Sequence, residues 1–162
     1  MKNFKPVISW IFALWISWNL MVSLTFKFTG APETKHIFGI IGDWMSTTIN
    51  QTIGTLFMNY GAYATGLVEL IASVFFLLPA LLFILNKAHL FQKHPQRSVF
   101  HLWGAKLTAV TLAGAIFFHL FTPLGIEVLY QGQGDGGSLF YSAVIMFTMS
   151  IIMLFLNRSK SA

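Results

Sequence analysis

The sequence predicts an all-α integral membrane protein: a four-helix bundle with an extra amphipathic outer-surface helix between the first and second spans. Of the 162 residues, 56% are hydrophobic and only 9% are charged, whereas a soluble domain carries about 25% charged residues. Four apolar segments are each long enough to cross a hydrocarbon core, which takes about 20 helical residues. A single domain over residues 1–162 is the expectation at this length.

The four predicted spans cover residues 7–28, 61–85, 99–121 and 139–156. Lys2 and Lys5 precede the first span, as basic residues do in a signal peptide. The apolar region of a signal peptide is only about 7–15 residues long, however, and is followed by a small-residue cleavage site. The first segment is longer and has no clear site of that kind, so we interpret it as an uncleaved span.

The basic residues are unevenly distributed between the two sides of a four-span chain. One side carries Lys2, Lys5, Lys87, Lys93, Arg97, Arg158 and Lys160. The other side carries Lys27 and Lys35, together with Glu33, Asp43, Glu127 and Asp135. Because Lys and Arg are in excess on the cytoplasmic side of membranes, both termini are predicted to be cytoplasmic. The net charge of +5 is then explained by topology, and no basic stripe with interleaved aromatic residues predicts nucleic-acid binding.

The segment between the first two spans has a helical apolar pattern. Apolar residues recur at helical spacing at Ile37, Ile40, Ile41, Trp44 and Met45. The stretch is too short to span, so it is predicted to lie on the outer membrane surface or over the mouth of the bundle.

A glycine-rich stretch, Gln131 to Ser138, connects the last two spans. It is predicted to be a flexible outer turn. Its N–H groups could form an anion-binding nest or belong to an ordinary loop.

Three of the spans carry a polar face. These faces consist of Asn19, Ser23 and Lys27 on the first span, Thr65, Glu69 and Ser73 on the second, and Thr108, Thr111 and His119 on the third. Polar side chains within spans usually face the interior of a bundle and often mark function. The three faces are therefore expected to meet one another.

The predicted positions along the membrane normal place three of these side chains at a similar depth. With the predicted boundaries, Glu69 lies about 12 Å inside the second span and His119 about 4–5 Å from the outer end of the third. Side chains tilt toward the N-terminus of their own helix, so Glu69 and His119 converge, and Lys27 is long enough to reach them. Taken singly, Lys27 would be a snorkelling lysine and His119 an interfacial histidine. Together they predict an interior Lys27–Glu69–His119 cluster, either as a ligand site or as a structural joint between helices.

Other cofactor chemistry is disfavoured by composition and spacing. The chain has no cysteine, which excludes thiolate metal sites and thiol–quinone oxidoreductases. His101 shares a helix face with His119 but lies about 27 Å away along the axis, so the two cannot ligate one haem. No metal site is expected. Lys106, on another face of the same span, is interpreted as a lysine that snorkels to the headgroups.

Three short motifs resemble the DoxX-like family of small four-helix membrane proteins. They are F-K-F-T-G-A-P-E at the end of the first span, G-L-V-E-L in the second and A-G-A-I-F-F-H-L at the end of the third. The resemblance implies that Lys27, Glu69 and His119 occupy the positions of the family's lysine, glutamate and histidine, in a bacterial-type inner membrane. The long outer segment from Glu33 to Asn59 and the basic second loop depart from the family pattern.

The resemblance implies roles in redox and assembly, and it leaves the function open. One expectation is an accessory subunit or assembly partner of a membrane complex, without catalysis of its own, with a protein partner or a second copy beside it in the bilayer. The alternative is a subunit of a quinone-linked oxidoreductase, in which His119 donates a hydrogen bond to a quinone, Glu69 relays protons and Lys27 stabilises the reduced form. A carrier is less expected because the halves show no inverted repeat.

Overall fold

The computed structural model describes residues 4–90 and 96–158. Within them, five helices account for most of the chain, and four are long and apolar enough to cross a membrane by length and composition. These four are α1 (Phe4–Thr29), α3 (Gln51–Lys87), α4 (Arg97–Phe121) and α5 (Ser138–Asn157). They indicate an integral membrane protein in contact with a lipid bilayer, as the sequence predicts.

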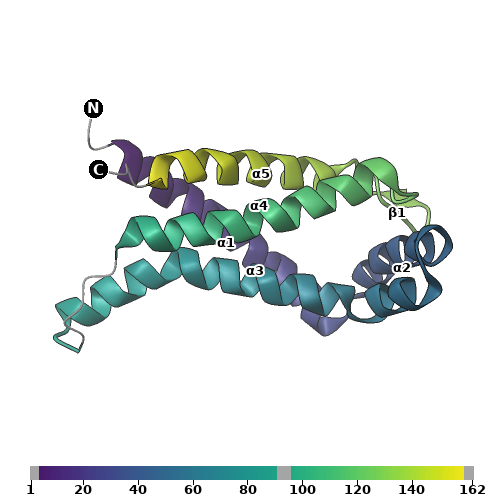
Figure 1. The fold of residues 1–162 in the computed structure, drawn as a ribbon, viewed down its shortest axis with the longest axis horizontal. Helices are drawn as coiled ribbons and strands as arrows, with labels where there is room; N and C mark the ends of the chain where they lie inside the picture. Colours follow the sequence, from purple (N-terminus) through teal and green to yellow (C-terminus); the bar gives the residue numbers. More distant parts are fainter. Residues whose placement is uncertain (1–3, 91–95, 159–162) are drawn as a thin grey trace.

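The four long helices lie side by side, with both chain termini at one end (Figure 1). Helix α1 contacts α3 and α5, and α4 contacts α3 and α5, so the four form a closed ring of neighbours. Helix α2 (Pro32–Thr48) and a short hairpin lie at the opposite end. We refer to these two ends as the terminal end and the α2 end.

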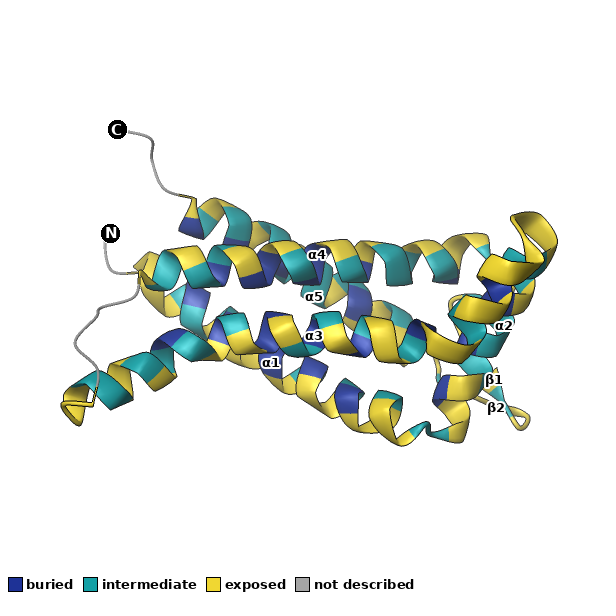
Figure 2. Ribbon diagram, turned by 60° about the horizontal axis from the view of Figure 1, so that its bottom comes forward, coloured by how far each residue is buried: buried dark blue, intermediate teal, exposed yellow. Residues whose placement is uncertain are grey.

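The apolar core lies along the axis of the bundle, where the buried faces of the four helices meet (Figure 2). Its members are Ala13, Ile16, Leu20, Ala72, Phe76, Ala105 and Met153. Phe76 is fully buried against Gly104, where an added Cβ would lie 2.7 Å from the phenylalanine ring. Small residues at helix contacts allow close approach between backbones, which is a main source of helix association inside a membrane.

Helix α3 begins ten residues before the predicted span, at Gln51 instead of Gly61. Asn50 is its N-cap, and its side chain accepts a hydrogen bond of 2.8 Å from the Thr52 N–H. This cap satisfies one of the free N–H groups at the helix start. At 37 residues, α3 is about 55 Å long, so it extends well beyond the roughly 30 Å hydrocarbon core of a bilayer.

Helix α2 packs across the α2 end of the bundle. Ile41 forms a second buried cluster with Leu124 and Val128 of the loop after α4. Around them pack the partly buried side chains of Ile37, Ile40, Met45, Phe57 and Phe118. The apolar residues of the predicted pattern therefore contact the protein itself.

The connection between α4 and α5 contains a hairpin, where the sequence suggests only a flexible turn. Strand β1 (Leu129–Tyr130) pairs antiparallel with β2 (Gln133–Gly134). Between them, Gln131 and Gly132 both have positive φ, 51° and 79°, as a two-residue type I′ turn requires. A hydrogen bond of 2.8 Å between His36 Nε2 and the Leu129 carbonyl oxygen ties the hairpin to α2.

Candidate functional site

A largely buried ion pair joins α1 to α3 near the α2 end of the bundle. Lys27 Nζ lies 2.5 Å from Glu69 Oε1 and donates a second hydrogen bond, of 2.9 Å, to Ser23 Oγ. The side chains are 15% and 6% exposed. Burying one of these charges alone would be costly, and the partner offsets that cost.

The sequence around the pair explains its position. Lys27 is in the last turn of α1, where the partial negative charge of the helix C-terminus favours a cation. Ser23 lies one turn earlier on the same face, within reach of the ammonium group. Glu69 lies on the buried face of α3, together with Gly66 and Ser73. Gly66 leaves room for Phe28 and Leu24 of α1, which brings the two helices close at the pair.

Glu69 retains an unused hydrogen-bonding atom. Its Oε2 is buried and has no hydrogen-bond partner. Beside the pair is a cavity of about 290 Å³. Lys27, Thr34, Lys35, Phe38 and Tyr63 are among the residues that line it. The cavity therefore places an ammonium group and apolar side chains around one space.

His119 is buried near the same end but takes a different partner. Its Nδ1 lies 2.7 Å from the carbonyl oxygen of Gly125, and its ring packs edge-on against Phe140 at 5.6 Å. A carbonyl oxygen only accepts, so Nδ1 carries the proton. No hydrogen bond or ion pair joins His119 to Lys27 or Glu69 among residues 4–90 and 96–158. His119 thus anchors the loop after α4. Of the three residues expected to form a cluster, only Lys27 and Glu69 bond to each other in the described residues.

The remaining predicted polar residues bond to their own helices. Asn19, Thr65, Ser73 and Thr111 each donate to the carbonyl oxygen four residues earlier, at 2.8–3.0 Å. This local bond satisfies a hydroxyl or amide group without a partner on another helix. Thr108 differs, because its hydroxyl is buried and has no recorded partner.

A second buried polar cluster lies at the terminal end, where sequence reasoning predicted none. Ser9 Oγ is 2.8 Å from His101 Nδ1, and the Asn157 side-chain amide donates to Ser9 Oγ at 2.9 Å. Arg97 Nη1 donates to Asn157 Oδ1 at 3.3 Å. The cluster joins α1, α4 and α5. In the sequence, this cluster is indicated only by a polar residue near the end of each of these helices.

The glycine-rich loop supplies its own anion. The carboxylate of Asp135 accepts the backbone N–H groups of Val128, Gly137 and Leu139, at 2.8, 3.0 and 3.0 Å, and the hydroxyl of Ser138. Burial acts to raise the pKa of Asp135, but these hydrogen bonds outweigh it and hold the pKa below its ordinary value. Among the N–H groups of the glycine-rich stretch, that of Gly137 is therefore occupied by Asp135.

Neither a metal cluster nor a known relative identifies the site. Within the described part of the chain, no three His, Asp or Glu side chains lie close enough together to hold a metal ion. No protein-family model, no curated protein and no solved structure matches this chain.

Proposed function

We propose that this chain is a DoxX-like protein of a bacterial-type inner membrane that acts as an accessory subunit or assembly partner of a membrane complex, without catalysis of its own. The proposal rests on the hydrogen-bond partners of the polar side chains at the site. Lys27 bonds to Ser23 and Glu69, and His119 bonds to Gly125. The Lys27–Glu69 contact fixes α1 against α3, and the His119–Gly125 contact fixes the loop after α4 against that helix, as structural joints do.

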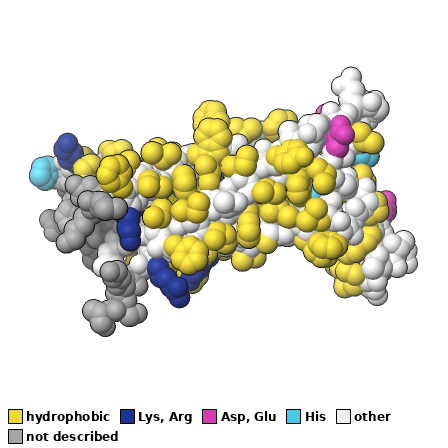
Figure 3. All heavy atoms as spheres, turned by 90° about the horizontal axis from the view of Figure 1, so that it is seen from above, with side chains coloured by type: hydrophobic (Ala, Val, Ile, Leu, Met, Phe, Trp, Pro, Cys, Tyr) yellow, Lys and Arg dark blue, Asp and Glu magenta, His cyan; other side chains and the backbone are white. Residues whose placement is uncertain are grey.

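The proposal includes an orientation. Among the described residues, the terminal end carries Lys5, Lys87, Arg97 and Arg158, and the view in Figure 3 has Lys and Arg at that end and acidic side chains at the other. Cytoplasmic termini follow from this distribution. Helix α2 is then the extra amphipathic helix at the outer surface, and its polar residues Glu33, Lys35 and Asp43 are exposed.

Co-purification from native membranes tests the accessory role. We expect a second protein, or a second copy of the chain, to remain bound in constant stoichiometry when the protein is extracted into nanodiscs and analysed by mass spectrometry. A chain that is always monomeric and free of protein partners would contradict the proposal.

A second candidate function rests on the cavity beside Lys27. The cavity has a volume of about 290 Å³, and a quinone headgroup within it could accept a hydrogen bond from Lys27 Nζ. The chain would then be a subunit of a quinone-linked oxidoreductase and would depend on a partner for electrons. The buried Oε2 of Glu69, which has no hydrogen-bond partner, supports a proton-handling role close by.

Quinone binding separates the two candidates. A short-chain quinone added to the purified protein should raise the unfolding temperature, and Lys27→Met should remove this effect. Lys106→Met is the matched control, because that exposed lysine lies 4.2 Å from the ring centroid of Trp103, away from the cavity. A shift that survives Lys27→Met would exclude this cavity as the quinone site.

A further inference from the structure

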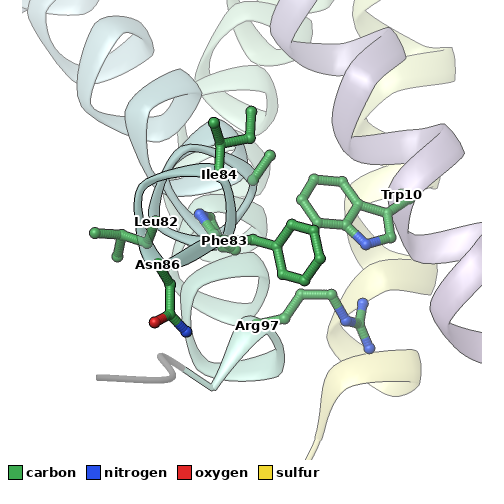
Figure 4. A pocket seen from close by; sticks show the side chains of 8 residues that line it. Trp10, Leu82, Phe83, Ile84, Asn86 and Arg97 are labelled. Atoms are coloured by element: carbon green, nitrogen blue, oxygen red, sulfur yellow. The ribbon is translucent and has the colours of Figure 1, made fainter. Parts of the chain in front are cut away.

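A larger groove lies at the terminal end, where α3 separates from its neighbours (Figure 4). It has a volume of about 500 Å³, and its lining includes Trp10, Pro79, Ala80, Leu82, Phe83 and Arg97. The ring of Phe83 extends toward Trp10 of α1 and Arg97 of α4. The groove thus has mainly apolar walls, and its polar side chains are the Arg97 guanidinium group and the Asn86 amide.

Pro79 accounts for the opening. It lies inside α3, and a proline within a helix has no N–H to donate and crowds the preceding turn, so it bends the helix. Beyond this point the last turns of α3 diverge from α4 (Figure 1). The groove is therefore built into the fold.

The polar end of the groove lies where lipid headgroups are expected. Arg97 is the first residue of α4, and Lys87 is the last residue of α3. Pro79 lies about 12 Å deeper than Lys87 along a helix axis. An acyl chain would meet apolar side chains in the groove while its headgroup remained at the helix ends.

The hydrogen bonds of Arg97 leave part of its guanidinium group available. Both recorded contacts use Nη1, with Asn157 Oδ1 at 3.3 Å and His101 Nδ1 at 3.4 Å. A guanidinium group has five N–H donors in a planar fork, which suits phosphate oxygens.

The chain provides no acidic side chain near Arg97. All five carboxylate side chains belong to described residues, namely Glu33, Asp43, Glu69, Glu127 and Asp135. Glu69 is the closest of them to the groove in sequence, and it lies ten residues before Pro79, about 15 Å along the axis. The ion pair recorded in the described residues joins Lys27 to Glu69, at the other end. Lys87 and Arg158 add further positive charge beside the helix ends. Basic pockets between spans attract anionic headgroups.

We propose that this groove binds an anionic phospholipid, with one acyl chain between Trp10 and Phe83 and the phosphate on Arg97. The inference does not depend on the Lys27–Glu69 pair or on the proposed function. It also holds for either orientation of the chain in the membrane.

Competition between two lipids tests the headgroup. The full chain in mild detergent is mixed with equal amounts of phosphatidylglycerol and phosphatidylcholine and analysed by native mass spectrometry. We expect one retained lipid per chain and about a tenfold preference for phosphatidylglycerol, because phosphatidylcholine has the same phosphate but its choline cation is repelled by the positive charge at the groove. Arg97→Gln should reduce the preference to nearly one. Lys106→Gln, at an exposed lysine of α4 that does not line the groove, should leave it unchanged. Equal retention of both lipids by the wild type, or equal losses in the two variants, would overturn the proposal.

Filling the groove tests the acyl-chain site without changing any charge. Ala80→Phe should abolish the retained lipid, whereas Leu81→Phe, at an exposed position outside the groove, should not. If Arg97→Gln does not fold, the comparison of Ala80→Phe with Leu81→Phe tests the proposal. Full retention in Ala80→Phe would show that the lipid lies elsewhere and would overturn the proposal.

Discussion

Lys27 and Glu69 differ from most polar side chains of the spans because each finds a charged partner on another helix. Asn19 and Thr65 are satisfied by carbonyl groups of their own helices, so they can be replaced without leaving a charge unpaired. The ion pair has no such local alternative. At the scale of single residues, the joint between α1 and α3 therefore depends on two side chains.

Removing one member of the pair should be more harmful than removing both. Lys27→Met leaves a buried carboxylate and Glu69→Gln leaves a buried ammonium group, and either loss is expected to destabilise the protein by about 3–5 kcal/mol. The double variant leaves no unpaired charge and should recover part of that loss. A double-mutant cycle from unfolding in detergent measures the coupling directly.

Lys35→Met is the control for this cycle. Lys35 lines the same cavity, but it is exposed and forms no ion pair with any described residue. Its effect should simply add to that of Glu69→Gln. Additive effects of Lys27→Met and Glu69→Gln would instead show that the pair does not stabilise the bundle.

Asp135 should make the stability of the loop before α5 depend on pH. Its pKa in the folded protein is lowered from the ordinary value of 3.8. The stabilisation is therefore complete above pH 3.8 and is lost as the pH falls through the lower folded value. Asp135→Asn should lower the unfolding temperature at neutral pH, and the difference from the wild type should shrink below pH 3.8.

The exposed Asp43 offers a control for this experiment, because its side chain accepts no hydrogen bond from any described residue. Asp43→Asn should leave the profile of unfolding temperature against pH close to that of the wild type. A difference between Asp135→Asn and wild type that stays constant down to the lowest pH would contradict the proposed cause.

At the scale of elements, α2 and α3 form a tight helical hairpin across one end of the bundle. Gly42 of α2 faces Gly54 and Met58 of α3, and the absence of a side chain lets the backbones approach closely. Asn50 starts α3 immediately after the turn between these helices. Short-range capping and close packing together explain why α3 begins before the membrane-length apolar segment.

Two glycines of α2 should respond in opposite ways to the same substitution. A Cβ at Gly42 would lie 2.7 Å from Met58 Cβ and 2.8 Å from the Gly54 carbonyl oxygen, so Gly42→Ala should destabilise by about 1–3 kcal/mol through overpacking. A Cβ at Gly39 would meet nothing within 4 Å. Gly39→Ala should therefore be neutral or stabilising by up to about 1 kcal/mol, from helix propensity alone. Thermal unfolding in detergent distinguishes them, and equal losses would refute the close packing.

At the scale of the whole molecule, charge differs between the two ends. Acidic side chains lie around α2 and the hairpin, and basic ones gather at the terminal end (Figure 3). Each end also has its own buried polar contacts, Lys27–Glu69 at one end and Ser9–His101–Asn157 at the other. The apolar core between them contains no charged residue.

Cysteine labelling tests the orientation of the whole chain, starting from a protein with no cysteine of its own. A cysteine at Ser161, which lies outside the described residues, should stay unlabelled when an impermeant reagent is added to intact cells. A cysteine at Gly132, in the exposed hairpin turn, should be labelled. The reverse pattern would place the termini outside.

The sequence predicts the long helices well because lipid requires about 20 consecutive apolar residues with every backbone group bonded inside its own helix. It also predicts the Lys27–Glu69 contact, because a buried carboxylate requires a partner and helix geometry limits the candidates. The start of α3 at Gln51 was missed, since the Asn50 cap lies in a polar stretch outside any span. The bend at Pro79 was missed as well, because an apolar pattern continues through it.

The sequence by itself thus determined the positions of the four membrane-length apolar segments, the charge difference between the two ends and the need for a partner at Glu69. These depend on local composition and on the periodicity of one helix. The tertiary structure alone decided that His119 bonds to Gly125, and that Ser9 meets His101 and Asn157, which are 92 and 148 residues away along the chain. A hydrogen bond forms only within about 3 Å, and the relative rotation of packed helices, set by their side chains, decides which polar groups come that close.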